Sequence, residues 1–219
     1  MGSITRSFAN NITTSGVLLP ASLNNNSISN VTAYNAAVAT GNMVLISSQT
    51  ASNSASISFT TGINSTYKEY QFYFINMNPS TDNTTFQFNG STDGGSNYNV
   101  TKTTTFFSAN HLEDDSYAAL NYFTAQDLAQ STSFQNISYN ELGGDADESF
   151  CGTLSLFNPA STTYVKHFIS SGSTYYSGNG ELNTYVAGYC NTTSAINAVQ
   201  FKMASGNIDD GTILMYGIK

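Results

Sequence analysis

Charged side chains are scarce in this sequence, and their scarcity excludes one class of partner. They make up 9% of the 219 residues, whereas about a quarter is usual in globular proteins. The six Lys and Arg residues lie singly along the chain, and the formal net charge is −8. Binding to a phosphate backbone requires clustered cations. We therefore expect no nucleic-acid partner.

Long apolar runs are also missing. No stretch approaches the roughly 20 apolar residues that cross a bilayer as a helix, so we expect no insertion into a membrane. The first residues, MGSITRSFANN, lack the basic segment and the apolar core of a secretory signal. We therefore expect the protein to be made in the cytoplasm.

Cysteine and histidine are rare, and tryptophan is absent. Cys151 and Cys190 lie in strand-like stretches, where a disulfide is possible but two buried free thiols fit a reducing compartment better. Neither His111 nor His167 has partners at the spacing of zinc ligands, and no nucleophile elbow or Cys/His pair with an orienting group occurs. Two carboxylates that meet only in space could still cleave glycosides, but so few charges disfavour it. We expect no enzymatic activity.

Asn, Ser, Thr, Gly and Tyr occupy the place of the missing charges, and they suit pleated surfaces and turns. Short apolar or alternating runs are separated by turn clusters, which predicts an all-β, antiparallel β-sandwich of jelly-roll-like type. The expected strands are 43–47, 56–59, 67–77, 84–88, 99–107, 131–139, 148–157, 162–169, 182–189, 199–203 and 213–218. One stretch, 114–130, could form a short helix capped by Asp114 or Asp115, or else a long loop.

The first part of the chain differs from the rest. Residues 1–42 are poor in charge and weakly periodic, with one apolar cluster at Val17, Leu18 and Leu19. Such a composition buries little by itself. We predict an extended N-terminal arm whose apolar cluster anchors the chain, although a frayed terminus is the alternative. The β-sandwich domain is expected to span residues 43–219.

Three acidic or glycine-rich stretches could bind ions, and each has a simpler interpretation. Gly90–Asn99 is not followed by the helix and Lys of a phosphate loop, so a β-turn loop is expected. Asp209 and Asp210 stand between two expected strands beside Gly211, which favours the tip of a hairpin over a site. Asp145, Asp147 and Glu148 form the best calcium candidate, with a solvated acidic loop as the alternative.

The loop SSGSTYYSGNGELN could bind glycans. It supplies Tyr175, Tyr176 and Asn179. Tyrosine rings pack on the C–H groups of sugars, and amides hydrogen-bond their hydroxyls. The same residues are also common in any loop of this composition, so both interpretations stay open.

Several segments together carry a resemblance to a known family. They are NMVLISSQTAS, SASISFTTGINSTYKEYQFYFINMNPSTDNTTFQF, STDGGSNYNVTKTTTFF, LAQSTSFQNIS, GTLSLFNPASTTYVKHFIS and, most specifically, QFKMASGNIDDGTILMYGIK. Residues 43–219 resemble β-sandwich virion proteins of marine tailed bacteriophages, including cyanophages, and MGSITRSFANNITTSG is similar to the beginning of such proteins. The resemblance implies a structural component of the virion, such as a capsid decoration, a fibre or another appendage, and it carries over no catalytic residue.

This resemblance sets the expected partners. They are other virion proteins of the capsid or tail, and further copies of the chain, with a homotrimer favoured because virion sandwiches commonly assemble around a symmetry axis. We expect a capsid decoration or head-fibre protein anchored by its arm and made in the host cytoplasm, without a cofactor other than the calcium considered above. The alternative is a tail fibre or adhesin whose loops bind a host surface glycan.

Overall fold

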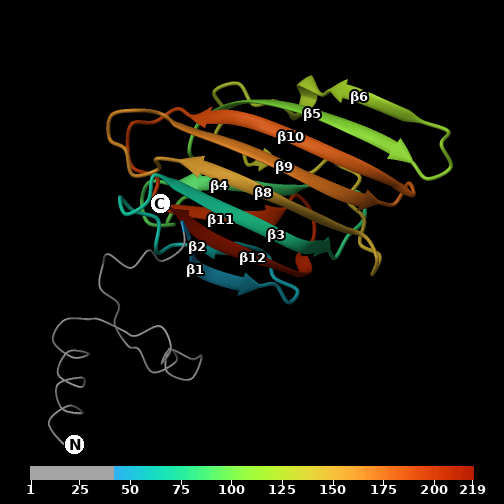
Figure 1. Ribbon diagram of the computed structural model, residues 1–219, viewed down its shortest axis with the longest axis horizontal. Helices are drawn as coiled ribbons and strands as arrows, with labels where there is room; N and C mark the ends of the chain where they lie inside the picture. The colour runs from blue at the N-terminus through green and yellow to red at the C-terminus, as the bar shows by residue number, and fades with distance from the viewer. Residues whose placement is uncertain (1–41) are drawn as a thin grey trace, which may run out of the picture. The chain divides into compact units, whose positions relative to one another are not determined.

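The computed structural model describes residues 42–219, which form two β-sheets packed face to face (Figure 1). Every pairing between neighbouring strands is antiparallel. The all-β sandwich expected from the sequence is therefore confirmed. The expected anchor at Val17, Leu18 and Leu19 lies outside the described residues.

The larger sheet has eight strands in the order β1-β12-β3-β8-β9-β10-β5-β6. Their bounds are β1 Met43–Thr50, β12 Ile208–Ile218, β3 Glu69–Pro79, β8 Ser149–Phe157, β9 Lys166–Tyr176, β10 Gly180–Cys190, β5 Lys102–Leu112 and β6 Ala118–Tyr122. The smaller sheet has four strands, in the order β2-β11-β4-β7. They are β2 Ile57–Phe59, β11 Ala198–Met203, β4 Phe86–Ser91 and β7 Gln135–Asn136.

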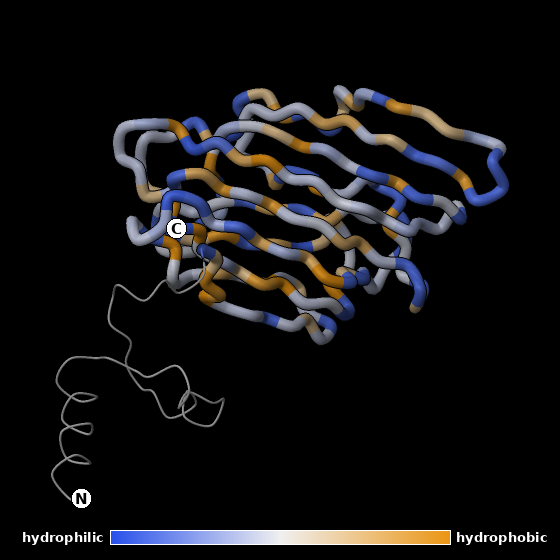
Figure 2. Tube along the Cα trace, viewed as in Figure 1, coloured by the Kyte–Doolittle hydropathy of each residue, from blue (hydrophilic) through white to orange (hydrophobic). Residues whose placement is uncertain are grey.

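The alternation of side chains along each strand explains the two layers. In β9 the residues from Lys166 to Tyr176 are alternately buried and more exposed, because successive side chains point to opposite faces of a sheet. Figure 2 shows the same alternation of hydrophobic and hydrophilic positions along many strands. The chain crosses between the sheets repeatedly, since β2, β4, β7 and β11 each lie between strands of the larger sheet in sequence. Both sheets therefore contribute their inner faces to one core.

Phenylalanine dominates that core. Phe72 and Phe74 of β3 face Phe86 of β4 and Phe201 of β11, and all four are at most 2% exposed. The ring centroids of Phe72 and Phe201 are 5.1 Å apart in an edge-to-face arrangement, which aromatic pairs favour. Because these contacts run between the sheets, the aromatic cluster fixes how the layers pack.

Two local expectations were wrong. Residues 114–130 contain neither the helix nor only a loop: they hold β6 and a short 3-10 turn, Thr124–Gln126. Asp209 and Asp210 do not lie at a hairpin tip, since β11 and β12 belong to different sheets. The reversal occurs before them, where Gly206 has a φ of 70°, and they follow Ile208 at the start of β12, beside a bulge at Gly211.

Both cysteines are free in the structure. Cys151 lies on β8 and Cys190 on β10, and β9 separates these strands. Cys190 is buried as expected, but Cys151 is exposed, so that part of the prediction was wrong. The Cys151 side chain instead contacts Asn76, whose backbone N–H lies 3.2 Å from the sulfur.

Candidate functional site

A cleft of about 640 Å³ opens between the end of the larger sheet and the loops beside the smaller one. This volume lies within the range of small-molecule sites. The lining residues are Asn83, Ser108, Asn110, Leu112, Tyr117, Asn121, Phe123, Tyr139, Glu141, Tyr176, Ser177, Gly178 and Leu182. They come from parts of the chain about one hundred residues apart, so the fold alone brings them together.

The floor of the cleft is formed by residues of β5, β6 and β10 that point to the inner face of the larger sheet. Ser108, Asn110 and Leu112 alternate along β5 and point to the inner face, and Leu182 pairs directly with Asn110 from β10. Asn121 stands on β6 beside Ser108. At this end the inner face of β5 and β6 is covered by loop residues rather than by a strand of the smaller sheet, which leaves the hollow.

Aromatic side chains form the walls. Tyr139 of the loop after β7 packs on Phe123, with ring centroids 4.5 Å apart, and both contact Phe106 of the core. Tyr176 ends β9 on the opposite side and is 6% exposed. Both tyrosines are therefore held by packing: Tyr139 is half-buried and presents part of its ring to the cleft, whereas Tyr176 forms a wall with little of its ring accessible.

Three phenols and one carboxylate are the titratable side chains that line the cleft. Burial raises the pKa of Tyr139 and of Tyr176, and the Glu141 carboxylate raises both further. A hydrogen bond with the Asn110 side chain opposes this rise at Tyr176. The phenols consequently stay neutral near pH 7. The Asn110 Oδ1 atom is buried, and among residues 42–219 it has no hydrogen-bond partner.

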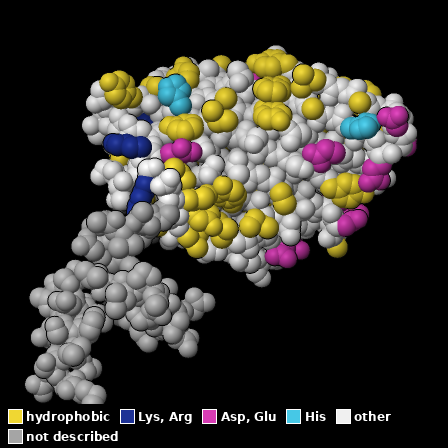
Figure 3. Space-filling view, viewed as in Figure 1, with side chains coloured by type: hydrophobic (Ala, Val, Ile, Leu, Met, Phe, Trp, Pro, Cys, Tyr) yellow, Lys and Arg dark blue, Asp and Glu magenta, His cyan; other side chains and the backbone are white. Residues whose placement is uncertain are grey.

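The cleft lies at the acidic end of the sandwich, where β5 ends and β10 begins. Eleven of the fourteen Asp and Glu residues belong to turns or strand ends there. They are Asp82, Glu113, Asp114, Asp115, Glu141, Asp145, Asp147, Glu148, Glu181, Asp209 and Asp210. Figure 3 shows acidic side chains toward this end of the visible face and lysines at the other. The potential at the cleft is therefore negative.

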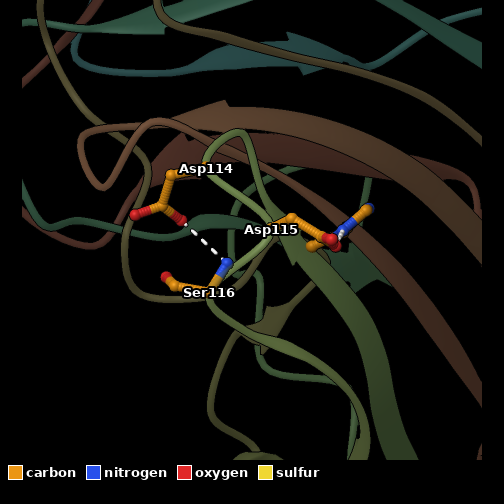
Figure 4. A network of polar contacts seen from close by, with 4 residues as sticks. Asp114, Asp115 and Ser116 are labelled. Atoms are coloured by element: carbon orange, nitrogen blue, oxygen red, sulfur yellow. Dashed lines mark hydrogen bonds and ion pairs between the residues drawn. The ribbon is translucent and has the colours of Figure 1, made fainter.

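A hydrogen-bonded acidic turn connects β5 to β6 and leads to the rim of the cleft (Figure 4). The Asp114 carboxylate accepts the backbone N–H of Ser116 at 3.0 Å, and hydrogen bonding to Ser116 lowers the Asp114 pKa. Asp115 adopts a φ of 59° and lies 3.0 Å from His111 Nε2. This turn positions Tyr117, which follows it directly.

The three residues expected to bind glycans do not form one site. Tyr176 faces the cleft, whereas Tyr175 points to the outer face of β9. The Tyr175 hydroxyl donates to Asn179 Oδ1 at 3.2 Å, so these two residues pair with each other on the outer side of the turn. Of the expected set, the cleft contains Tyr176 alone.

The calcium candidates lie in a loop stabilised by its own hydrogen bonds. Asn78 Nδ2 donates to the carbonyl oxygens of Asp145 and Glu148, and the Glu148 carboxylate accepts the N–H of Asp145. Asp147 and Glu148 line a depression shared with Asp209 and Asp210. Within residues 42–219 no three or more His, Cys, Asp or Glu side chains are arranged to hold a metal ion. Calcium binding here stays a prediction.

In the Gly90–Asn99 stretch, Gly90 and Ser91 end β4 and residues 92–99 form the loop after it, so the expected loop is present. Ser91 Oγ donates to Asp93 Oδ1 at 2.6 Å, and Asn97 donates to the same carboxylate through its backbone and side chain. These bonds, with the one from Ser91 first, lower the pKa of Asp93 to about 2. The backbone N–H groups of Gly94 and Gly95 donate to Asn197 Oδ1 and Ser91 Oγ, so protein side chains already occupy them.

Comparison with known proteins adds no relative: no family model, no curated protein and no solved structure matches the chain. Between residues 42 and 219 there is also no helix long and apolar enough to cross a bilayer. The features that bear on function are therefore the cleft and the exposed faces of the sandwich.

Proposed function

We propose that the protein is a non-enzymatic structural component of a phage virion, a capsid decoration or head-fibre protein attached through residues 1–42. The supporting observation is the outer face of the larger sheet. There Phe107 pairs with Tyr122 on one side and Tyr185 on the other, and the Phe107 and Tyr185 rings stack 5.1 Å apart. Leu120 is 72% exposed and Ile169 55%. Exposed apolar surface of this extent is typical of protein contacts.

This surface and the resemblance to virion sandwiches support the same role. A sheet face with exposed aromatic and aliphatic side chains suits packing against capsid proteins or against further copies of the chain, for which a homotrimer is the proposed assembly. The proposed location is the virion, after synthesis in the host cytoplasm. Nothing in this role requires a catalytic group.

Immunogold electron microscopy of purified particles tests the virion role. With an antibody raised against residues 43–219, we expect gold label over the capsid, because the proposed arm attaches the sandwich there. Label on the tail would contradict capsid decoration and would favour the alternative role in host adhesion. Particles that carry the protein nowhere would refute the virion role altogether.

Recognition of a host surface glycan is the second candidate, and the cleft is the observation that favours it. Tyr117 and Tyr139 offer ring faces in front of the wall that Tyr176 forms, while Asn83 and Asn121 offer amides as hydrogen-bond partners. This combination suits sugars, which present C–H faces and hydroxyls together. Glycan recognition and a structural role can coexist in one virion protein.

A pair of adjacent tyrosines provides the test. We expect Tyr176→Ala to weaken retention on host polysaccharide about tenfold or more, because it removes a wall of the cleft. Tyr175→Ala is the matched control, since Tyr175 lies on the other face of the same strand. Affinity electrophoresis measures both, with circular dichroism to check folding. Asn121→Ala, at a half-buried cleft position, should weaken retention too; equal retention by all variants would contradict glycan binding in the cleft.

A further inference from the structure

We infer that the cleft selects non-acidic saccharides, neutral or amino-substituted, and excludes sugars that carry carboxylate, sulfate or phosphate groups. This inference rests on the proposed glycan recognition and adds the class of ligand. Two independent features of the cleft carry it: the kind of polar atoms that line it, and the sign of the charge around it.

The first feature is a group that only accepts hydrogen bonds. The Glu141 carboxylate lines the cleft and, when ionised, can only accept. A ligand that donates hydrogen bonds, through hydroxyl or ammonium groups, can pair with this carboxylate. An anionic group on the ligand would bring further acceptors and leave the carboxylate without a donor.

The second feature is the one-sided charge. The residues that line the cleft include the Glu141 carboxylate and no Lys or Arg, and further carboxylates lie in turns at the same end of the sandwich. The lysines lie elsewhere. Lys68, Lys102, Lys166 and Lys219 are at the strand ends of the opposite end of the sandwich, and Lys202 lies over the Phe134 ring on the smaller sheet. No described cation is therefore placed to bind an acidic sugar, and the field repels one.

Glu141 is the residue that sets this preference most directly, because it is the carboxylate inside the cleft. At contact distance, repulsion between two carboxylates at a protein surface is strong enough to change an affinity by about tenfold. Removing the Glu141 charge should therefore improve the binding of acidic sugars by about tenfold and weaken the binding of amino sugars, with little effect on neutral ones.

Glu141→Gln tests the inference against a matched control. Glu181→Gln removes the same charge at the same end of the sandwich, but Glu181 lies on the outer face of β10, where it accepts a hydrogen bond from Ser173 Oγ. Full-length wild-type protein and both variants are applied to a glycan array that contains neutral, amino and acidic oligosaccharides. Dissociation constants for the bound glycans are then measured by calorimetry at low salt.

We expect wild-type protein to bind neutral and amino glycans only, and Glu141→Gln to gain acidic glycans while Glu181→Gln does not. Acidic glycans bound as well as neutral ones by the wild type would overturn the inference. An unchanged preference in Glu141→Gln would overturn it as well. In either case, weaker binding of neutral glycans by Tyr176→Ala would show that the cleft still recognises glycans. An array with no bound glycan would reject both the inference and the recognition function.

Discussion

Replacing Phe201 by Ala is expected to lower the free energy of unfolding by about 3–5 kcal/mol, the range for deleting a buried aromatic side chain. Phe201 lies on β11 with no exposed surface. Its ring is within 6.4 Å, centroid to centroid, of five others: Phe59, Phe72, Phe74, Phe86 and Phe88. Two of these belong to the larger sheet, so the substitution leaves a cavity between the layers.

Chemical denaturation followed by far-UV circular dichroism measures the effect, since the chain has no tryptophan for fluorescence. Phe107→Ala is the matched control, because Phe107 is 39% exposed on the outer face. It should change the free energy of unfolding by about 1 kcal/mol or less. Equal losses for Phe107→Ala and Phe201→Ala would show that the core is not centred on Phe201.

The strands could be predicted because their pattern is local. The run from Glu69 to Pro79 alternates buried and less buried positions over most of its length, and a period of two has few explanations besides a strand. β6 was missed because Ala, Leu and Asn dominate Ala118–Tyr122, and these residues do not favour strands. Its place at the edge of the larger sheet, beside β5 alone, overrides that weak propensity.

Sheet assignment could not be predicted from the same pattern. The residues around Asp209 show that the chain reverses, but they do not show whether the next strand pairs with the previous one or joins the other layer. In the structure β12 pairs with β1 and β3 rather than with β11. Long-range pairing of this kind depends on which apolar faces meet, and no short stretch of sequence contains that information.

The cleft illustrates the same limit. Tyr176 was recognised as a candidate from its loop, and the period of two along the strand could already have placed Tyr175 on the opposite face. Tyr117, Tyr139 and Glu141 were missed, because they stand in separate turns with no motif around them. Their proximity to Tyr176 arises from the packing of loop residues over β5 and β6.

The Lys102 side chain is a cation buried among neutral groups, and its burial should make the stability of the protein depend on pH. It has no exposed surface, and its Nζ donates to Asn89 Oδ1 at 2.6 Å and to the Val100 carbonyl at 2.7 Å. No carboxylate in residues 42–219 lies within ion-pair distance of it. Burial lowers the pKa of Lys102 from 10.5 to about 8, although interaction with Cys190 opposes the shift.

The direction of the pH dependence follows from this lowered pKa. Between pH 8 and 10.5 the unfolded state binds a proton at Lys102 that the folded state has lost, so the free energy of unfolding rises with pH. Below pH 8 the folded protein keeps the buried Lys102 ammonium charged, which lowers the free energy of unfolding by about 3 kcal/mol. Lys166 contributes in the same direction, because burial lowers its pKa also. Cys190 acts oppositely, since burial raises its pKa from 9.0 to about 11. The effect of Lys102 on the free energy of unfolding is therefore best measured below about pH 9.

We therefore expect the free energy of unfolding of the wild type to increase by about 1 kcal/mol from pH 7 to pH 9. Lys102→Met should remove most of this increase. It should also stabilise the protein at pH 7 by about 1–2 kcal/mol, since the loss of two hydrogen bonds offsets only part of the gain. Lys68→Met, at an exposed position, is the control and should keep the wild-type slope. Denaturation curves at each pH measure these values, and a Lys102→Met slope equal to the wild type would mean that the Lys102 ammonium is not desolvated as the fold implies.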